Sequence, residues 1–86
     1  LKQKIAAIKG CSAENIMLGN GSDECIDLLI RAFCEPKLDN IIVCPPTYGM
    51  YQVYADINDV PVKNVSLTAD YQLDLSSIAE AIDYRT

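Results

Sequence analysis

Hydrophobic residues repeat three or four positions apart in four stretches of the chain, which is the spacing of one helix face. The stretches predict helices over residues 1–8, 22–34 and 47–57, and a fourth that begins at Asp74 or Ser77 and ends at residue 82. Gly10 and Pro36 are typical stop signals for the first two helices. Thr47 is a typical cap for the third.

Short apolar runs lie between these helices and predict three strands, at residues 16–18, 41–44 and 60–65. The second run is unbroken, which is typical of a strand covered on both faces. Pro61 suits only the first turn or an edge of the third strand. Strands that alternate with helices indicate an α/β fold with a parallel sheet, and 86 residues allow one small domain at most.

Two loops follow predicted strands at their carboxyl ends, where an open α/β sheet binds its ligands. The first is Gly19-Asn-Gly-Ser-Asp-Glu24, which leads into a helix. The first N–H groups of a helix lack intrahelical partners and carry partial positive charge, so they form a phosphate site. Gly21 would let the backbone approach the phosphate, and the Ser22 hydroxyl would donate a hydrogen bond to it.

The same loop also fits a structural role, in which Ser22 caps the helix while Asp23 and Glu24 complement its dipole. A bound phosphate would require both carboxylates to point away or to hold another donor. No Gly-Lys-Ser/Thr triplet occurs, so the loop is not a Walker A motif. The dinucleotide fingerprint also lacks its third small residue, because Glu24 stands in that place.

Two prolines stiffen the second loop, Cys44-Pro-Pro-Thr-Tyr48, and fix an extended exit from the strand. They aim Tyr48 at the carboxyl edge of the sheet, where an aromatic ring can stack on a flat ligand. A tyrosine packed after a turn is the alternative interpretation. Tyr51 and Tyr54 are expected to face a core or a partner.

Composition narrows the classes of function. The formal charge of −5 leaves no basic face for nucleic acid, because only Lys2, Lys4 and Lys9 cluster, on a helix expected to be solvated. Four cysteines occur without a C-x-x-C pair and histidine is absent, which argues against a metal site. The three cysteines within apolar runs are expected to be reduced and buried, in a cytoplasmic protein with no membrane segment: Cys25, Cys34 and Cys44.

Three stretches of the sequence, LGNGSDE, IDLLIRAFCEP and CPPTYGMY, together resemble the histidinol-phosphate aminotransferases. These are fold-type I enzymes that use pyridoxal 5′-phosphate (PLP). The likeness continues through LDLSSIAEAI. The glycine loop alone is common to many aminotransferases, but its combination with PPTYGMY is much more specific. One departure is Lys37-Leu38 before Asp39-Asn40, in a surface turn where relatives often carry a single glycine.

The resemblance implies that residues 1–86 form a single partial domain, a segment of the large PLP-binding domain of a homodimer. It implies that the PLP phosphate lies on the helix start that matches Ser22 and Asp23, with Glu24 beside it. The tyrosine that matches Tyr48 stacks on the pyridine ring. The parent enzyme would transfer an amino group between histidinol phosphate and 2-oxoglutarate, a step of histidine biosynthesis.

The resemblance also implies that no catalytic residue lies within the chain, which is expected to be inactive alone. In this family the lysine that binds PLP covalently, the acid at the pyridine nitrogen and the substrate arginines all come later in the sequence. None of the five lysines here lies in a matching motif. The alternatives are a segment of another fold-type I enzyme, such as a decarboxylase-like relative, an acidic interaction module, or a small phosphate-binding protein.

In the large domain of the family, the strand that matches residues 16–18 lies apart from the strands that match residues 41–44 and 62–65. Its backbone groups would lack partners here, which is costly in a buried strand. We therefore expect this segment to repack, to associate with another chain, or to be ordered only within a larger assembly.

Overall fold

Four α-helices, one short 3-10 helix and two strands make up the chain in the computed structural model, which describes residues 1–86. Their order is α1 (Lys2–Lys9), η1 (Ala13–Asn15), α2 (Gly21–Phe33), β1 (Ile41–Val43), α3 (Met50–Ile57), β2 (Val62–Asn64) and α4 (Leu75–Ala81). All four predicted helices and two of the three predicted strands are confirmed. None of the helices has the length and apolar character needed to cross a membrane.

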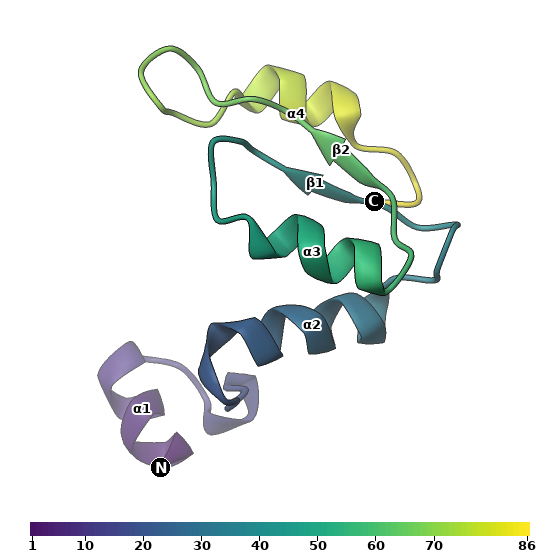
Figure 1. Ribbon diagram of the computed structural model, residues 1–86. Coiled ribbons are helices and arrows are strands. Elements are labelled where there is room, and N and C mark those ends of the chain that lie inside the picture. The colour runs from purple at the N-terminus through teal and green to yellow at the C-terminus, as the bar shows by residue number, and fades with distance from the viewer.

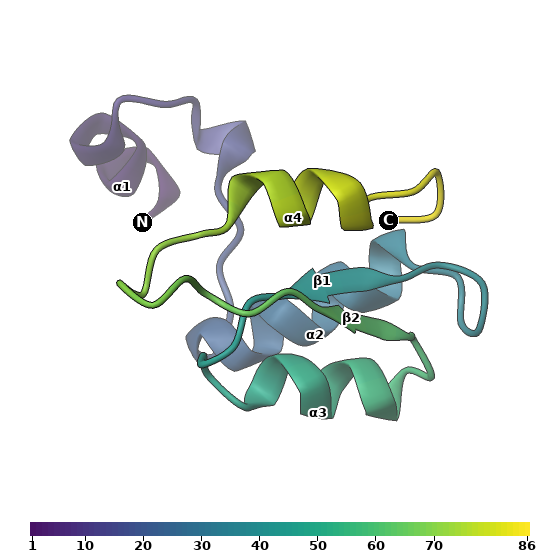
Figure 2. The same cartoon turned by 90° about the horizontal axis from the view of Figure 1, so that it is seen from above.

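The two strands pair in parallel, with Ile41 opposite Val62 and Val43 opposite Asn64. Helix α3 connects them, so β1, α3 and β2 form one crossover unit, the connection that parallel strands require. Figures 1 and 2 show α3 and α2 on one side of this small sheet and α4 on the other. The predicted α/β fold with a parallel sheet is thus confirmed.

The core lies between the sheet, α2 and α3. Ile30, Ala55 and Val60 form its buried centre, and partly buried side chains from neighbouring elements pack against them. Only six residues of the chain are buried, whereas many large apolar side chains are exposed, so the core is small for a chain of this length. All four cysteines are free, but the three expected to be buried are only half-buried, because so little of the chain is enclosed.

The strand predicted at residues 16–18 is wrong. This segment makes no ladder, and the side chain of Met17 is 45% exposed. A strand exists only where another strand accepts its hydrogen bonds, and β1 and β2 pair with each other instead. The expected separation of residues 16–18 from the other two strands is therefore what the structure shows. Figure 1 shows α1 at the N-terminal end, beyond the start of α2 and away from the sheet.

Two of the predicted helix caps are also wrong. Ser22 is the second residue of α2, so its hydroxyl does not occupy the cap position, which belongs to Asn20. Thr47 lies three residues before the first residue of α3, too early to cap it. Of the two starts considered for the fourth helix, the structure selects Asp74, whose carboxylate accepts a hydrogen bond from the Ser77 N–H at 3.2 Å.

A polar network fastens the last residues of the chain to the beginning of β1. Buried Asn40 donates to the Asp83 carboxylate at 3.2 Å and accepts from the Thr86 hydroxyl at 2.9 Å. Lys63 of β2 donates to the same carboxylate at 2.7 Å. The hydrogen bond from Lys63, followed by those from the Arg85 N–H and from Asn40, lowers the pKa of Asp83 to about 2.

Candidate functional site

The structure brings together the two loops that the sequence singled out. The phenol of Tyr48 donates to the carboxylate of Asp23, at 2.9 Å from Oδ1 and 3.1 Å from Oδ2. Asp23 lies in the first turn of α2, whereas Tyr48 belongs to the loop that leaves the carboxyl end of β1. This bond therefore joins the start of a helix to the edge of the sheet, the place expected for a ligand.

The backbone at the start of α2 requires glycine. Gly21 has a φ of 73°, in the left-handed region that side chains disfavour, and its N–H donates to the Gly19 carbonyl at 3.0 Å. The N–H groups of the first helical turn that follows have no acceptor within the helix. Ser22 is exposed at this point. The predicted phosphate-binding position at the start of α2 thus has free N–H donors and an accessible hydroxyl.

The two acids of this loop each hold another donor. Asp23 accepts from Tyr48, and Glu24 accepts from the Asn20 side-chain amide at 3.0 Å. A bare carboxylate at this helix start would repel a phosphate, and its own attraction to the helix dipole would compete with one. The hydrogen bonds meet the condition that a phosphate at this position imposes on Asp23 and Glu24.

Two side chains contact the edges of the Tyr48 ring and leave part of the ring exposed. Tyr48 is 52% exposed, so about half of its surface is open to a ligand. Tyr51 packs against it edge to face, with ring centroids 6.1 Å apart. The hydrogen bond to Asp23 raises the pKa of Tyr48 above its ordinary value, so the phenol stays protonated and donates at neutral pH.

A close approach fixes a second glycine in the loop. A Cβ atom on Gly19 would lie 2.7 Å from the Sγ atom of Cys25, which is too short for any side chain to be accepted without movement. The Sγ atom of Cys25 therefore packs directly against the glycine loop at Gly19. The half-buried thiol packs here as a small apolar group.

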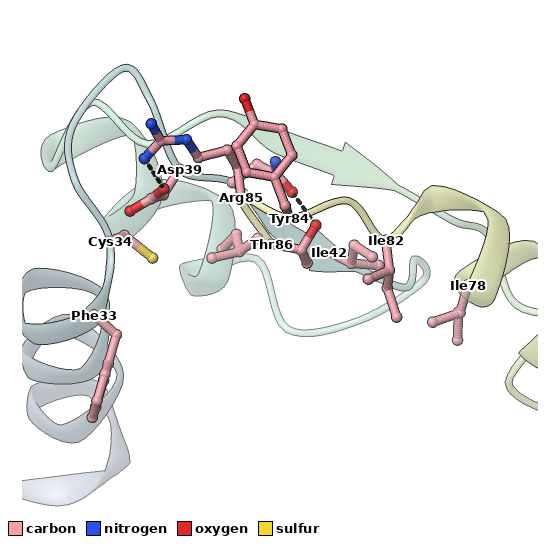
Figure 3. Close-up of a pocket in the computed structure, with 11 residues that line it drawn as sticks. Phe33, Cys34, Asp39, Ile42, Ile78, Ile82, Tyr84, Arg85 and Thr86 are labelled. Carbon is pink, nitrogen blue, oxygen red and sulfur yellow. Dashed lines mark hydrogen bonds and ion pairs between the residues drawn. The ribbon is translucent and has the colours of Figure 1, made fainter.

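The largest hollow of the chain lies elsewhere. It has a volume of about 570 Å³ and lies between the end of α2, the beginning of β1 and the residues after α4 (Figure 3). Arg85 borders it but is already paired with Asp39, at 3.2 Å between Nη1 and Oδ1. A smaller hollow of about 140 Å³ lies beside Cys44, Thr47 and Tyr51. The candidate site is therefore an open surface at the end of β1 and not the largest hollow.

Sequence reasoning placed the five candidate residues at one edge of the sheet but missed the contact between them. Gly21, Ser22, Asp23 and Glu24 form the start of α2, and Tyr48 reaches them through the bond to Asp23. The two prolines before Tyr48 were the only sequence signal that this tyrosine would reach the first loop, and they do not identify Asp23 as its partner. No three side chains of the kinds that bind metals come together in the chain.

Comparison with known proteins gives consistent matches. The model of the family described as aminotransferase class I and II matches residues 1–86. The histidinol-phosphate aminotransferase of Cytophaga hutchinsonii is 52% identical over 100% of the chain, and that of Christiangramia forsetii is 51% identical over 95% of it. The chain spans 25% and 23% of these two relatives, about a quarter of their length.

A solved structure gives the same result for the fold. The crystal structure of a protein from Erwinia carotovora atroseptica, assigned as a histidinol-phosphate aminotransferase, superposes with a TM-score of 0.76 at 30% identity. The match covers 93% of this chain and 23% of that one. The arrangement of helices around the two strands is therefore one that occurs within a larger aminotransferase fold.

Proposed function

Because this chain belongs to the class I and II aminotransferase family, we propose that it forms part of the cofactor site of a histidinol-phosphate aminotransferase. The observation that carries the proposal is the hydrogen bond between Tyr48 and Asp23, which joins the two loops that resemble the cofactor loops of that family. The relatives named above are all histidinol-phosphate aminotransferases, which favours this activity over a decarboxylase-like one or an interaction module. The proposed reaction exchanges an amino group between histidinol phosphate and 2-oxoglutarate.

The residues at the site fit PLP. Its phosphate would lie at the start of α2, against the N–H groups from Ser22 to Glu24 and the Ser22 hydroxyl, with Gly21 giving the backbone its close approach. Its pyridine ring would stack on Tyr48, whose side chain is more than half exposed. Asp23 and Glu24 keep their charge, but each carboxylate is held by a hydrogen bond to another side chain rather than by the N–H groups that the phosphate would use.

The role of these residues is to bind and to orient. When bound, PLP supplies the electron sink that amino-group transfer requires. The start of α2 fixes one end of the cofactor and Tyr48 fixes its plane, so the chain sets position rather than moving protons. None of its five lysines lies among the residues of the site. We assign the covalent lysine, the acid at the pyridine nitrogen and the substrate arginines to other parts of a longer protein.

The same proposal places residues 1–86 within the large domain of a cytoplasmic homodimer. Exposed apolar side chains on α2, such as Leu29 and Phe33, support it, because apolar surface of this extent normally lies against other protein. The small core supports it as well, since five buried hydrophobic residues are few for a domain that folds by itself.

A titration with PLP tests the function. The 86-residue chain should bind PLP weakly and reversibly, and borohydride should trap no stoichiometric link to one lysine. Tyr48→Ala and Ser22→Ala should weaken binding, whereas Tyr71→Ala, an exposed tyrosine outside the two loops, should not. A defined reducible adduct with transaminase turnover would refute the assignment of the lysine to another part of the protein.

A chimera completes the test. Residues 1–86 would replace the matching quarter of the Cytophaga hutchinsonii relative, to which they are 52% identical. The chimera should bind PLP and transfer the amino group of histidinol phosphate to 2-oxoglutarate. A folded chimera that binds no PLP would contradict the proposed function.

A further inference from the structure

We propose that Asp23 is a positioning residue for Tyr48: its side chain holds the phenol and sets the tilt of the ring at the site. The inference rests on the proposed function and deepens it. It gives Asp23 a role through its carboxylate, which is separate from the backbone N–H that the same residue offers at the start of α2.

The geometry of the bond supports this role. The Tyr48 oxygen lies at nearly equal distances from both carboxylate oxygens, 2.9 and 3.1 Å, so either oxygen accepts the same proton. Asp23 lies in the first turn of a 13-residue helix, the longest in the chain, whereas Tyr48 stands in a loop. The helix is therefore the rigid partner, and the loop residue takes its orientation from it.

The ring of Tyr48 is fixed from two directions. Asp23 holds its hydroxyl end, and Tyr51 packs against it edge to face with an interplanar angle of 87°. Tyr51 belongs to α3, so the two contacts come from different helices. Without the bond to Asp23, the contact with Tyr51 alone would leave the tilt of an exposed ring free.

The Tyr48–Asp23 hydrogen bond also connects the proposed phosphate position at the start of α2 to the ring that would stack on PLP. The other acid of the loop, Glu24, is held by Asn20 from within the same loop, so that bond connects nothing else. Asp23 instead connects residues 25 positions apart. A substitution or ligand that alters the start of α2 should therefore also alter the orientation of the Tyr48 ring, because both involve this carboxylate. Such coupling acts equally in both directions.

The ionisation of Tyr48 reports the bond directly and without cofactor. The groups that act on the phenol are Asp23 first, and then Tyr54 and Tyr51. In the 86-residue chain labelled with 13Cζ-tyrosine, Asp23→Ala, which removes the acceptor, should lower the pKa of Tyr48 towards that of a free tyrosine. The matched control is Asp27→Ala, the same change one turn further along α2, where the carboxylate pairs with Arg31 at 3.0 Å. It should leave the pKa of Tyr48 unchanged.

Cofactor affinity tests the positioning role in the chimera described above. Asp23→Ala should weaken PLP binding by about 2- to 10-fold, the range expected for one lost hydrogen bond. Asp23→Asn, whose amide oxygen still accepts from the phenol, should stay within about 2-fold of the unsubstituted chimera. Tyr48→Phe should match Asp23→Ala, and the double variant should bind no more weakly than either single one.

Two results would overturn the inference. One is a pKa of Tyr48 that Asp23→Ala leaves unchanged, and the other is a double variant whose loss of affinity is the sum of the two single losses. A purely structural Asp23 would lower the melting temperature without moving the pKa of Tyr48. These outcomes are distinct from failure of the proposed function, which is seen when the unsubstituted chimera binds no PLP.

Discussion

Replacing Val60 with alanine measures how much the small core contributes to holding the chain together. Val60 is 3% exposed and packs against Ile30 and Ala55. The change removes two buried carbon groups at about 0.8 kcal/mol each, or about 1.6 kcal/mol. A cavity that does not collapse raises the loss to about 3 kcal/mol. Because five buried hydrophobic residues make a small core, we expect stability near the low end of the range for this length, about 4 kcal/mol, so the loss is a large share.

Urea unfolding of the 86-residue chain, followed by far-UV circular dichroism, gives the measurement. A slope of about 1 kcal/mol per molar urea converts the loss into a midpoint lower by about 1.5 to 3 M. Val53→Ala is the matched control, because Val53 is 41% exposed on α3 and should change stability by no more than about 0.5 kcal/mol. Equal losses in the two variants, or a chain without a cooperative transition, would refute the reasoning.

Three further predictions follow from the polar contacts and the unpaired segment. The pKa of Asp83 in the folded chain is lowered from 3.8 to about 2, so the stabilisation by its carboxylate is present above about pH 4 and lost as the pH falls towards 2. The urea midpoint should therefore fall less steeply with decreasing pH in Asp83→Asn than in the unsubstituted chain. Midpoints that fall in parallel in the two chains would contradict this. Asp74→Ala should fray α4 and speed amide exchange at Ser77, and an unchanged rate would show that the cap is idle. The Met17 amide should exchange quickly and the Val65 amide, which bonds across the sheet, slowly; equal protection would indicate a paired strand around Met17.

Local patterns were sufficient to predict the helices and the parallel pair. The apolar spacing of residues 22–34 and the proline that follows define α2 within one residue at each end. The unbroken run at 41–44 and the run at 60–65 became β1 and β2, because the helix between them leaves room only for a parallel crossover. These features depend on neighbours a few residues apart, which is the range that a sequence pattern describes.

The errors fall where a partner decides the outcome. Residues 16–18 have the composition of a strand but no strand to pair with, so they stay irregular. Thr47 has the chemistry of a cap, yet the turn after β1 delays the helix beyond its reach. Sequence composition describes what a residue prefers, whereas these two positions are determined by where the chain goes next.

The candidate site was predictable in its parts and not in its assembly. Glycines before a helix and prolines before a tyrosine indicated two loops at one edge. The bond from Tyr48 to Asp23 spans 25 residues, and the bond from Asn40 to Asp83 spans 43. Neither follows from spacing, because the first depends on how the chain turns back between α2 and β1, and the second on how it turns back through α3, β2 and α4.

The contact between Gly19 and Cys25 constrains the order in which these two positions can change. Any side chain at position 19 meets the sulfur 2.7 Å away, so a lineage that gains alanine there first passes through a clashing intermediate. Losing the thiol first, as in Cys25→Ala, removes the obstacle and makes the later change permissible. Leaving the glycine loop is therefore easier when position 25 changes first, and reaching it from a sequence with alanine at both positions is easier when position 19 changes first.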